Sequence, residues 1–218
     1  MTTPTKAEMT ALVNQLRAIA PKRPLTYGES LQVARLQASR YRQWAAAIEP
    51  EINLIGLVKQ RLMPVSFVPS YKLNGESGLT TDAVDGKLQI FVNENEPLVR
   101  QRFSLLHEMK HALDFDKAEL LHSKLGRGNQ KLHDDMIEWL ANEFAAHVLM
   151  PTALVKRIWF TTQNLSLAAS LFNVSTEAMA TRLEKLGLIG TPKPAPRIYF
   201  RQVGSLPMSP LDVPCLAA

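Results

Sequence analysis

The chain has 218 residues, 46% hydrophobic and 21% charged, a composition that fits a globular protein and excludes wholesale disorder. Its apolar stretches are too short to span a bilayer, and residues 1–22 lack the apolar segment of a secretory signal. The single cysteine, Cys215, excludes an internal disulfide and fits a reducing compartment. We therefore expect a cytoplasmic protein that does not bind membranes.

The net charge of +5 is unevenly distributed. Residues 1–50 and residues 151–218 each hold seven Lys or Arg residues against three acids, whereas the hundred residues between them hold eleven against fourteen. Basic ends around an acidic centre favour a functional site in the centre and a polyanion or acidic partner at the ends. A solvated surface with a modest basic bias explains the same distribution equally well.

Three helices are expected within the first 62 residues. Apolar residues recur at helical spacing over residues 5–19, and two prolines follow this segment. Thr26 and Glu29 have the spacing of a capping box, ahead of a second helix that extends to about Ala47. Pro50 precedes the third helix, over residues 51–62.

The pattern becomes β-prone after residue 63. Residues 65–68, 78–83 and 87–92 read as short strands, and Asp85-Gly86 between the last two is a hairpin signal. A small antiparallel sheet is therefore expected. Its strand at 87–92 could offer an edge to an extended peptide.

Helices dominate the rest of the chain, so the expected fold class is α+β and mostly helical. The patterns predict helices at 96–115, 131–150 and 151–160, a loop at 125–130, and two short helices within 165–188. From residue 191 the chain holds six of its fourteen prolines, which argue against a further packed helix and leave one strand at 197–202.

An HExxH motif, His107-Glu108-Met109-Lys110-His111, lies inside the predicted helix at 96–115. Two histidines at positions i and i+4 lie one turn apart on one face, so both imidazoles can reach one metal ion. Glu108 is turned by about 100° from His107, which places its carboxylate beside the metal. That is the position of a general base for hydrolysis.

A catalytic zinc site needs a third protein ligand. The extended motif HExxHxxGxxH would need glycine and histidine where this chain has Asp114 and Lys117, so that subclass is excluded. Glu138 on the following helix fits instead, with Asp134 and Asp135 as the other candidates.

Other residues near the motif are weaker candidates for direct metal ligands. Asn142, one turn beyond Glu138, could accept a hydrogen bond from the far nitrogen of a liganding histidine. His147 lies about 180° from Glu138 on the same helix and is not expected to be a ligand. His122 and His133 fall in or beside a loop and are expected at the surface.

Three segments together resemble the ImmA/IrrE metallopeptidase family. Residues 102–113, RFSLLHEMKHAL, are close to the family's usual RFTLAHELGH; residues 138–151, EWLANEFAAHVLMP, match its ExxANxFAAxLLMP block; and residues 90–93, IFVN, look like its IxxN strand. The resemblance covers residues 65–188. It implies a zincin-like, gluzincin-type peptidase in which His107, His111 and Glu138 hold zinc and Glu108 is the catalytic base. Lys110 replaces the family's usual glycine and is expected to add bulk and charge near the cleft.

The resemblance also suggests a division of the chain. We expect an N-terminal helical region at 1–62, a zincin-like metallopeptidase core at 63–160, a helix-turn-helix-like region at 161–190 and a proline-rich tail at 191–218. A DNA-binding version would place residues 176–186 in the major groove. The exposed face of that helix would carry Glu177, Thr181, Arg182, Glu184 and Lys185. Two acids against two bases make a poor phosphate contact set, so a cap that docks on the core or on the substrate is favoured over DNA binding.

The function implied by the resemblance is a regulatory protease of bacteria, phages or mobile elements. Its substrate would be a helix-turn-helix repressor encoded nearby, and its cofactor Zn²⁺, although Mn²⁺ or Fe²⁺ could occupy the same ligands. One alternative is a non-enzymatic DNA-binding regulator with a structural zinc; another is a toxin-like protease paired with an antitoxin. A structural zinc usually has four protein ligands, and no fourth ligand is evident near the motif, which favours catalysis.

Overall fold

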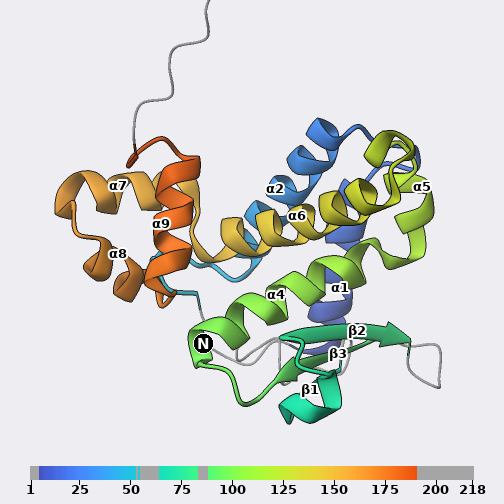
Figure 1. The fold of residues 1–218 in the computed structure, drawn as a ribbon, viewed down its shortest axis with the longest axis horizontal. Helices are drawn as coiled ribbons and strands as arrows, with labels where there is room; N and C mark the ends of the chain where they lie inside the picture. Colours follow the sequence, from blue (N-terminus) through green and yellow to red (C-terminus); the bar gives the residue numbers. More distant parts are fainter. Residues whose placement is uncertain (1–4, 53, 55–63, 83–87, 191–218) are drawn as a thin grey trace, which may run out of the picture.

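The computed structural model describes residues 5–52, 54, 64–82 and 88–190, and it shows a mostly helical α+β fold with a small sheet (Figure 1). The main helices are α1 (Lys6–Ile19), α2 (Tyr27–Trp44), α4 (Leu98–Asp114), α6 (Gln130–Leu149), α7 (Thr152–Thr162), α8 (Leu165–Phe172) and α9 (Thr176–Lys185). The strands are β1 (Val65–Val68), β2 (Gly78–Asp82) and β3 (Leu88–Asn93). Short helical turns are η1 (Ser70–Leu73), η2 (Phe115–Lys117), α5 (Ala118–His122) and η3 (Gly126–Gly128).

The first two helices begin where their sequence predicts. The Thr5 and Thr26 hydroxyls accept hydrogen bonds from the amides of Glu8 and Glu29, and each glutamate accepts one in return from the threonine amide. Two of the otherwise unpaired amide groups at each helix start are thereby satisfied. The helix expected at 51–62 falls almost wholly outside the described residues, as do the Asp85-Gly86 turn and the strand at 197–202.

The sheet has the strand order β1-β3-β2 and is mixed. The β2–β3 pair is antiparallel, as expected, but β1 runs parallel to β3, with Val65 opposite Ile90. The chain leaves β1 through η1 and forms β2 before β3, which then lies between the other two strands. The expected edge at 87–92 is therefore wrong: β3 is the central strand, and β2 is an outer strand of the sheet.

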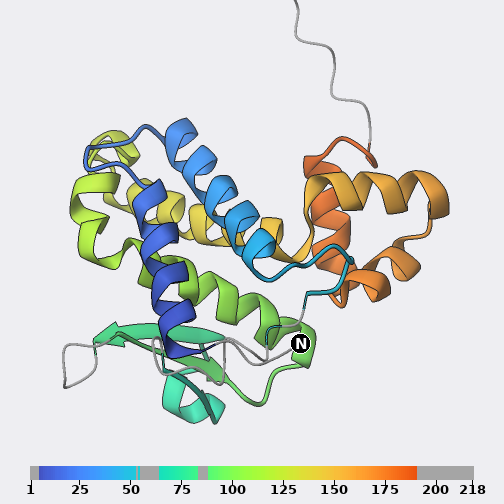
Figure 2. The same cartoon turned by 180° about the vertical axis from the view of Figure 1, so that it is seen from behind.

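Helix α4 lies between the sheet and α6, and α2 packs on α6 from the other side (Figures 1 and 2). Ala141 and Ala145 of α6 are fully buried, and such small side chains allow helices to approach closely. One hydrophobic cluster joins residues of α1 and α2 to α4, α6 and the C-terminal helices. No helix among the described residues is long and apolar enough to cross a membrane.

Helices α7, α8 and α9 form a group at the C-terminal end of α6 (Figure 1). Asn173 ends α8 in the left-handed conformation, and the Ser175 hydroxyl caps α9 by accepting from the Ala178 amide. The expected exposed face of α9 includes Arg182, and this is wrong, because Arg182 is only 3% exposed. Its guanidinium donates to the Met150 carbonyl and to the Thr152 hydroxyl, which fixes α9 to the end of α6.

Candidate metal centre

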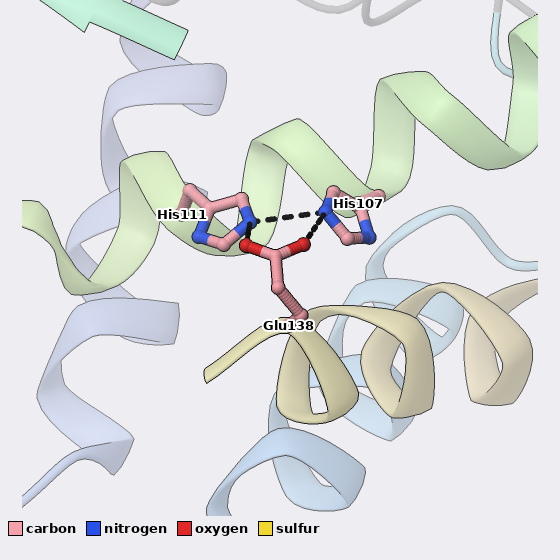
Figure 3. Close-up of side chains that lie close together, drawn as sticks. All are labelled: His107, His111 and Glu138. Atoms are coloured by element: carbon pink, nitrogen blue, oxygen red, sulfur yellow. Dashed lines mark hydrogen bonds and ion pairs between the residues drawn. The ribbon is translucent and has the colours of Figure 1, made fainter. Parts of the chain in front are cut away.

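His107 and His111 lie one turn apart on α4 and point toward Glu138 on α6 (Figure 3). His107 Nε2 is 3.0 Å from Glu138 Oε2 and 3.0 Å from His111 Nε2, and His111 Nε2 is 3.4 Å from Glu138 Oε1. Ligands of a tetrahedral zinc ion with bonds of about 2.0–2.1 Å lie roughly 3.3 Å apart. The three side chains thus have the donor types and the spacing of a zinc site.

The electrostatics of the site pair the Glu138 carboxylate with the two imidazoles. Hydrogen bonds from His107 and then His111 hold the pKa of the Glu138 carboxyl well below its usual range, so it is ionised. Burial acts to lower the pKa of His107, but its contacts with Glu138 outweigh burial and raise it. His107 Nδ1 lies 3.0 Å from Asn142 Oδ1, a contact that directs Nε2 toward Glu138.

Glu108 is 8% exposed and is held by the outer strand β2. The Thr80 hydroxyl lies 2.8 Å from Glu108 Oε2 and 3.1 Å from the Glu108 carbonyl. At Gly78, a Cβ atom would lie 2.8 Å from Glu108 Cγ and 3.0 Å from Oε1. Glycine is therefore needed at this position to leave room for the carboxylate. The sequence gives no signal for Gly78 or Thr80, because both act across the fold and not along one helix.

A cleft of about 980 Å³ contains the histidines, Glu108 and Glu138. That volume is enough for several residues of a peptide. β2 supplies Gly78, Leu79 and Thr80 to one wall. The cleft extends from there past the N-terminal half of α4 to α9.

Several predicted placements need correction. Lys110 does not lie at the cleft: it is 3% exposed, and its ammonium bonds both oxygens of Asp114. His122 is not at the surface but 3% exposed in α5, with Nε2 3.2 Å from the same carboxylate. Lysine is accommodated at this position because its ammonium pairs with the buried Asp114 carboxylate, which also contacts His122, and none of these three residues lines the cleft.

The other histidine and acidic residues considered as ligands lie apart from the group formed by His107, His111 and Glu138. Asp134 accepts from Gln130 and lies beside His133, and His147 Nδ1 contacts the Glu143 carbonyl. Within the described part of the chain, the group of acidic and imidazole side chains spaced for a metal consists of His107, His111 and Glu138.

A comparison with models of known protein families finds one that matches this chain. A peptidase family model described as the IrrE N-terminal-like domain matches residues 67–184, which is more than half of the chain. The chain belongs to the ImmA/IrrE family. The matched region of this ImmA/IrrE protein includes β2, both motif helices and nearly all of α9.

Among solved structures, the protein is similar to a Mycobacterium tuberculosis transcriptional regulator, with 14% sequence identity and a TM-score of 0.49. The match covers 83% of this chain and 52% of the regulator, so the ImmA/IrrE protein spans about half of that chain's length. No curated protein matches the sequence.

Proposed function

We propose that the protein is a zinc-dependent endopeptidase with a regulatory role. The observation that carries this proposal is the convergence of His107, His111 and Glu138, with the Glu108 carboxylate held beside them in one cleft. Family membership supports peptidase chemistry of this kind. The donor set, two imidazoles and one carboxylate, is the one that zinc peptidases of the thermolysin type use.

The three ligands would hold Zn²⁺, which, when bound, would supply a Lewis acid that acidifies water and polarises the scissile carbonyl. Glu108 takes the proton from the attacking water and passes it to the leaving amide nitrogen. Thr80, by donating to Oε2, orients that carboxylate. The outer strand β2, which lines the cleft, would align an extended substrate backbone by strand addition.

The proposed substrate is a helix-turn-helix repressor encoded near the gene for this chain. This follows from the likeness to the family, together with a cleft large enough to take a peptide segment. The alternative of a DNA-binding regulator is less well supported, because four of the five residues expected on the DNA-facing side of α9 line the cleft, and one of these, Arg182, is buried. A toxin-like protease would use the same site and differ only in its partner.

The test is cleavage of the neighbouring repressor by zinc-loaded wild-type protein and by Glu108→Gln. Glutamine keeps the shape of the side chain but cannot take a proton, so we expect a rate loss of about 10²–10⁴-fold. Zinc stoichiometry, measured in parallel, should stay at one per chain in both proteins. Equal cleavage by the two proteins, or the absence of zinc binding by the wild type, would contradict the proposal.

A further inference from the structure

The second helix of the helix-turn-helix-like pair forms a wall of the cleft. Ser175, Glu177, Ala178, Thr181 and Lys185 of this segment line the same cavity as the metal ligands. Arg182, which also lines the cavity, fixes the helix through Met150 and Thr152. A peptide in the cleft would therefore contact α9, and the side chains there would select its sequence.

The part of the cleft between the metal ligands and α9 is apolar. Phe103, one turn before His107, contributes a ring whose centroid is 6.5 Å from that of His107. Side chains from the end of α6, the residue after it, the turn before α9 and α9 itself complete this lining: Ala146, Leu149, Met150, Val174 and Ala178. An apolar substrate side chain placed here would leave water, which favours binding.

The basic residues of the cleft differ in whether they already have a hydrogen-bond or ion-pair partner. Arg100 lies 3.4 Å from the Ser77 hydroxyl and 3.9 Å from Glu96, and the Arg182 guanidinium is buried in its contacts with α6 and α7. Lys185, in the last turn of α9, is exposed and has no hydrogen bond or ion pair to any residue that the structure describes. Its ammonium is thus available to a bound ligand.

We infer that α9 is the substrate-reading element of the cleft, taking an apolar side chain against Ala178 and an acidic side chain at Lys185. The inference rests on the proposed function for its ligand class, an extended peptide. It assigns to the helix-turn-helix-like region a role in peptide selection, with the same face that a DNA-binding relative would turn to the major groove.

Affinity selection tests this without relying on catalysis. Full-length, zinc-loaded Glu108→Gln protein is incubated with a mixture of short synthetic peptides of randomised sequence, and the retained peptides are sequenced. We expect enrichment of Asp or Glu at one position and of apolar residues at another. Adding Lys185→Glu should remove the acidic preference, favour Lys or Arg instead, and weaken binding of the best acidic peptide by about fivefold.

Two further variants separate the parts of the inference. Ala178→Phe should remove the apolar preference and keep the acidic one, because it fills the pocket without changing the charge. Lys156→Glu, an exposed charge change on α7 that does not line the cleft, should alter neither. All proteins are compared by circular dichroism, so that only folded variants are scored.

Three outcomes would overturn the inference: no acidic enrichment, unchanged selection after Lys185→Glu, or loss of duplex DNA binding in that variant with peptide selection intact. Peptide selection and peptide cleavage are measured separately, so failure of one proposal can be told from failure of the other. Wild-type protein that selects acidic peptides but cleaves none would support this inference and contradict the proposed activity.

Discussion

At the scale of single residues, the proposed general base is positioned from outside its own helix. Glu108 projects from α4, but its carboxylate is bonded by Thr80 and has room because residue 78 is glycine. Two residues of β2 thus hold a side chain that lies 28 to 30 positions later in the chain. The position of the proposed base is thus set by a helix and a strand together.

Gly78→Ala should lower kcat/KM by about 10- to 100-fold, because the new methyl group would displace the Glu108 carboxylate by a fraction of an ångström or more. Zinc affinity should be unchanged, since Gly78 does not contact the ligands. Gly28→Ala is the matched control, because nothing lies within 4 Å of a Cβ atom there. Equal loss of activity in both variants would show that the effect is not specific to the site.

Asn142→Ala should weaken zinc binding by about 10- to 100-fold, because His107 Nδ1 loses the partner that orients its ring. Asn142→Asp keeps an oxygen in place and should retain most of the affinity. Competition with a chromogenic chelator measures both variants. A wild-type affinity in Asn142→Ala would mean that the packing of α4 alone orients the ring.

How far the sequence predicts these residues depends on whether their relation is local. The one-turn spacing of His107 and His111 follows from helix geometry, and the position of Asn142 relative to Glu138 follows from the same rule. The contact of Gly78 and Thr80 with Glu108 depends on how the sheet packs against α4, and no local pattern indicates it. Lys110 shows the opposite problem: its position in the motif suggested the cleft, but a buried carboxylate on its own helix determines where it points.

At the scale of elements, local signals again predicted most of what was found. Apolar spacing located α1, and the Thr26–Glu29 capping box located the start of α2, because each signal involves residues three or four positions apart. The parallel pairing of β1 with β3 was not predictable from alternation, since it depends on the path of the chain through η1. The placement of α9 beside the cleft likewise depends on long-range contacts, those of Arg182 with Met150 and Thr152 and those of Met179 and Leu183 with the core.

Arg182→Ala should lower the free energy of unfolding by about 2–4 kcal/mol, because it removes a buried charged group together with its hydrogen bonds to Met150 and Thr152. Arg157→Ala, an exposed change on α7, should stay within about 0.5 kcal/mol of wild type. Urea denaturation followed by circular dichroism gives both values. A small effect at Arg182 would mean that apolar packing alone holds α9.

At the scale of the whole molecule, buried polar groups couple stability to pH. His147 of α6 contacts Glu143, which also pairs with Arg35 of α2 at 2.8 Å. Burial, followed by the charge of Arg182, lowers the pKa of His147 from 6.5 to about 4. The folded protein therefore keeps this imidazole neutral at a pH at which the unfolded chain protonates it.

Wild-type protein should accordingly lose stability as the pH falls from 6.5 to about 4, because in this window the unfolded state binds one more proton at His147. His147→Gln cannot bind that proton and should lose about 1–3 kcal/mol less over the same range. Unfolding curves at several pH values, with a chelator present in both samples, measure the difference. An equal loss of stability in the two proteins over this pH range would contradict the lowered pKa of His147.

The continuous core has a consequence for what can be separated from this protein. The segment that matches the family begins at residue 67, yet Leu12, Leu16 and Tyr41 are in the same buried cluster as Phe144 and Val148. A recombinant fragment cut at the family boundary would expose the side of α6 that α2 covers, and we expect such a fragment to aggregate. Gene fusions or domain exchanges that keep the protein folded must therefore include α1 and α2 together with the segment that matches the family.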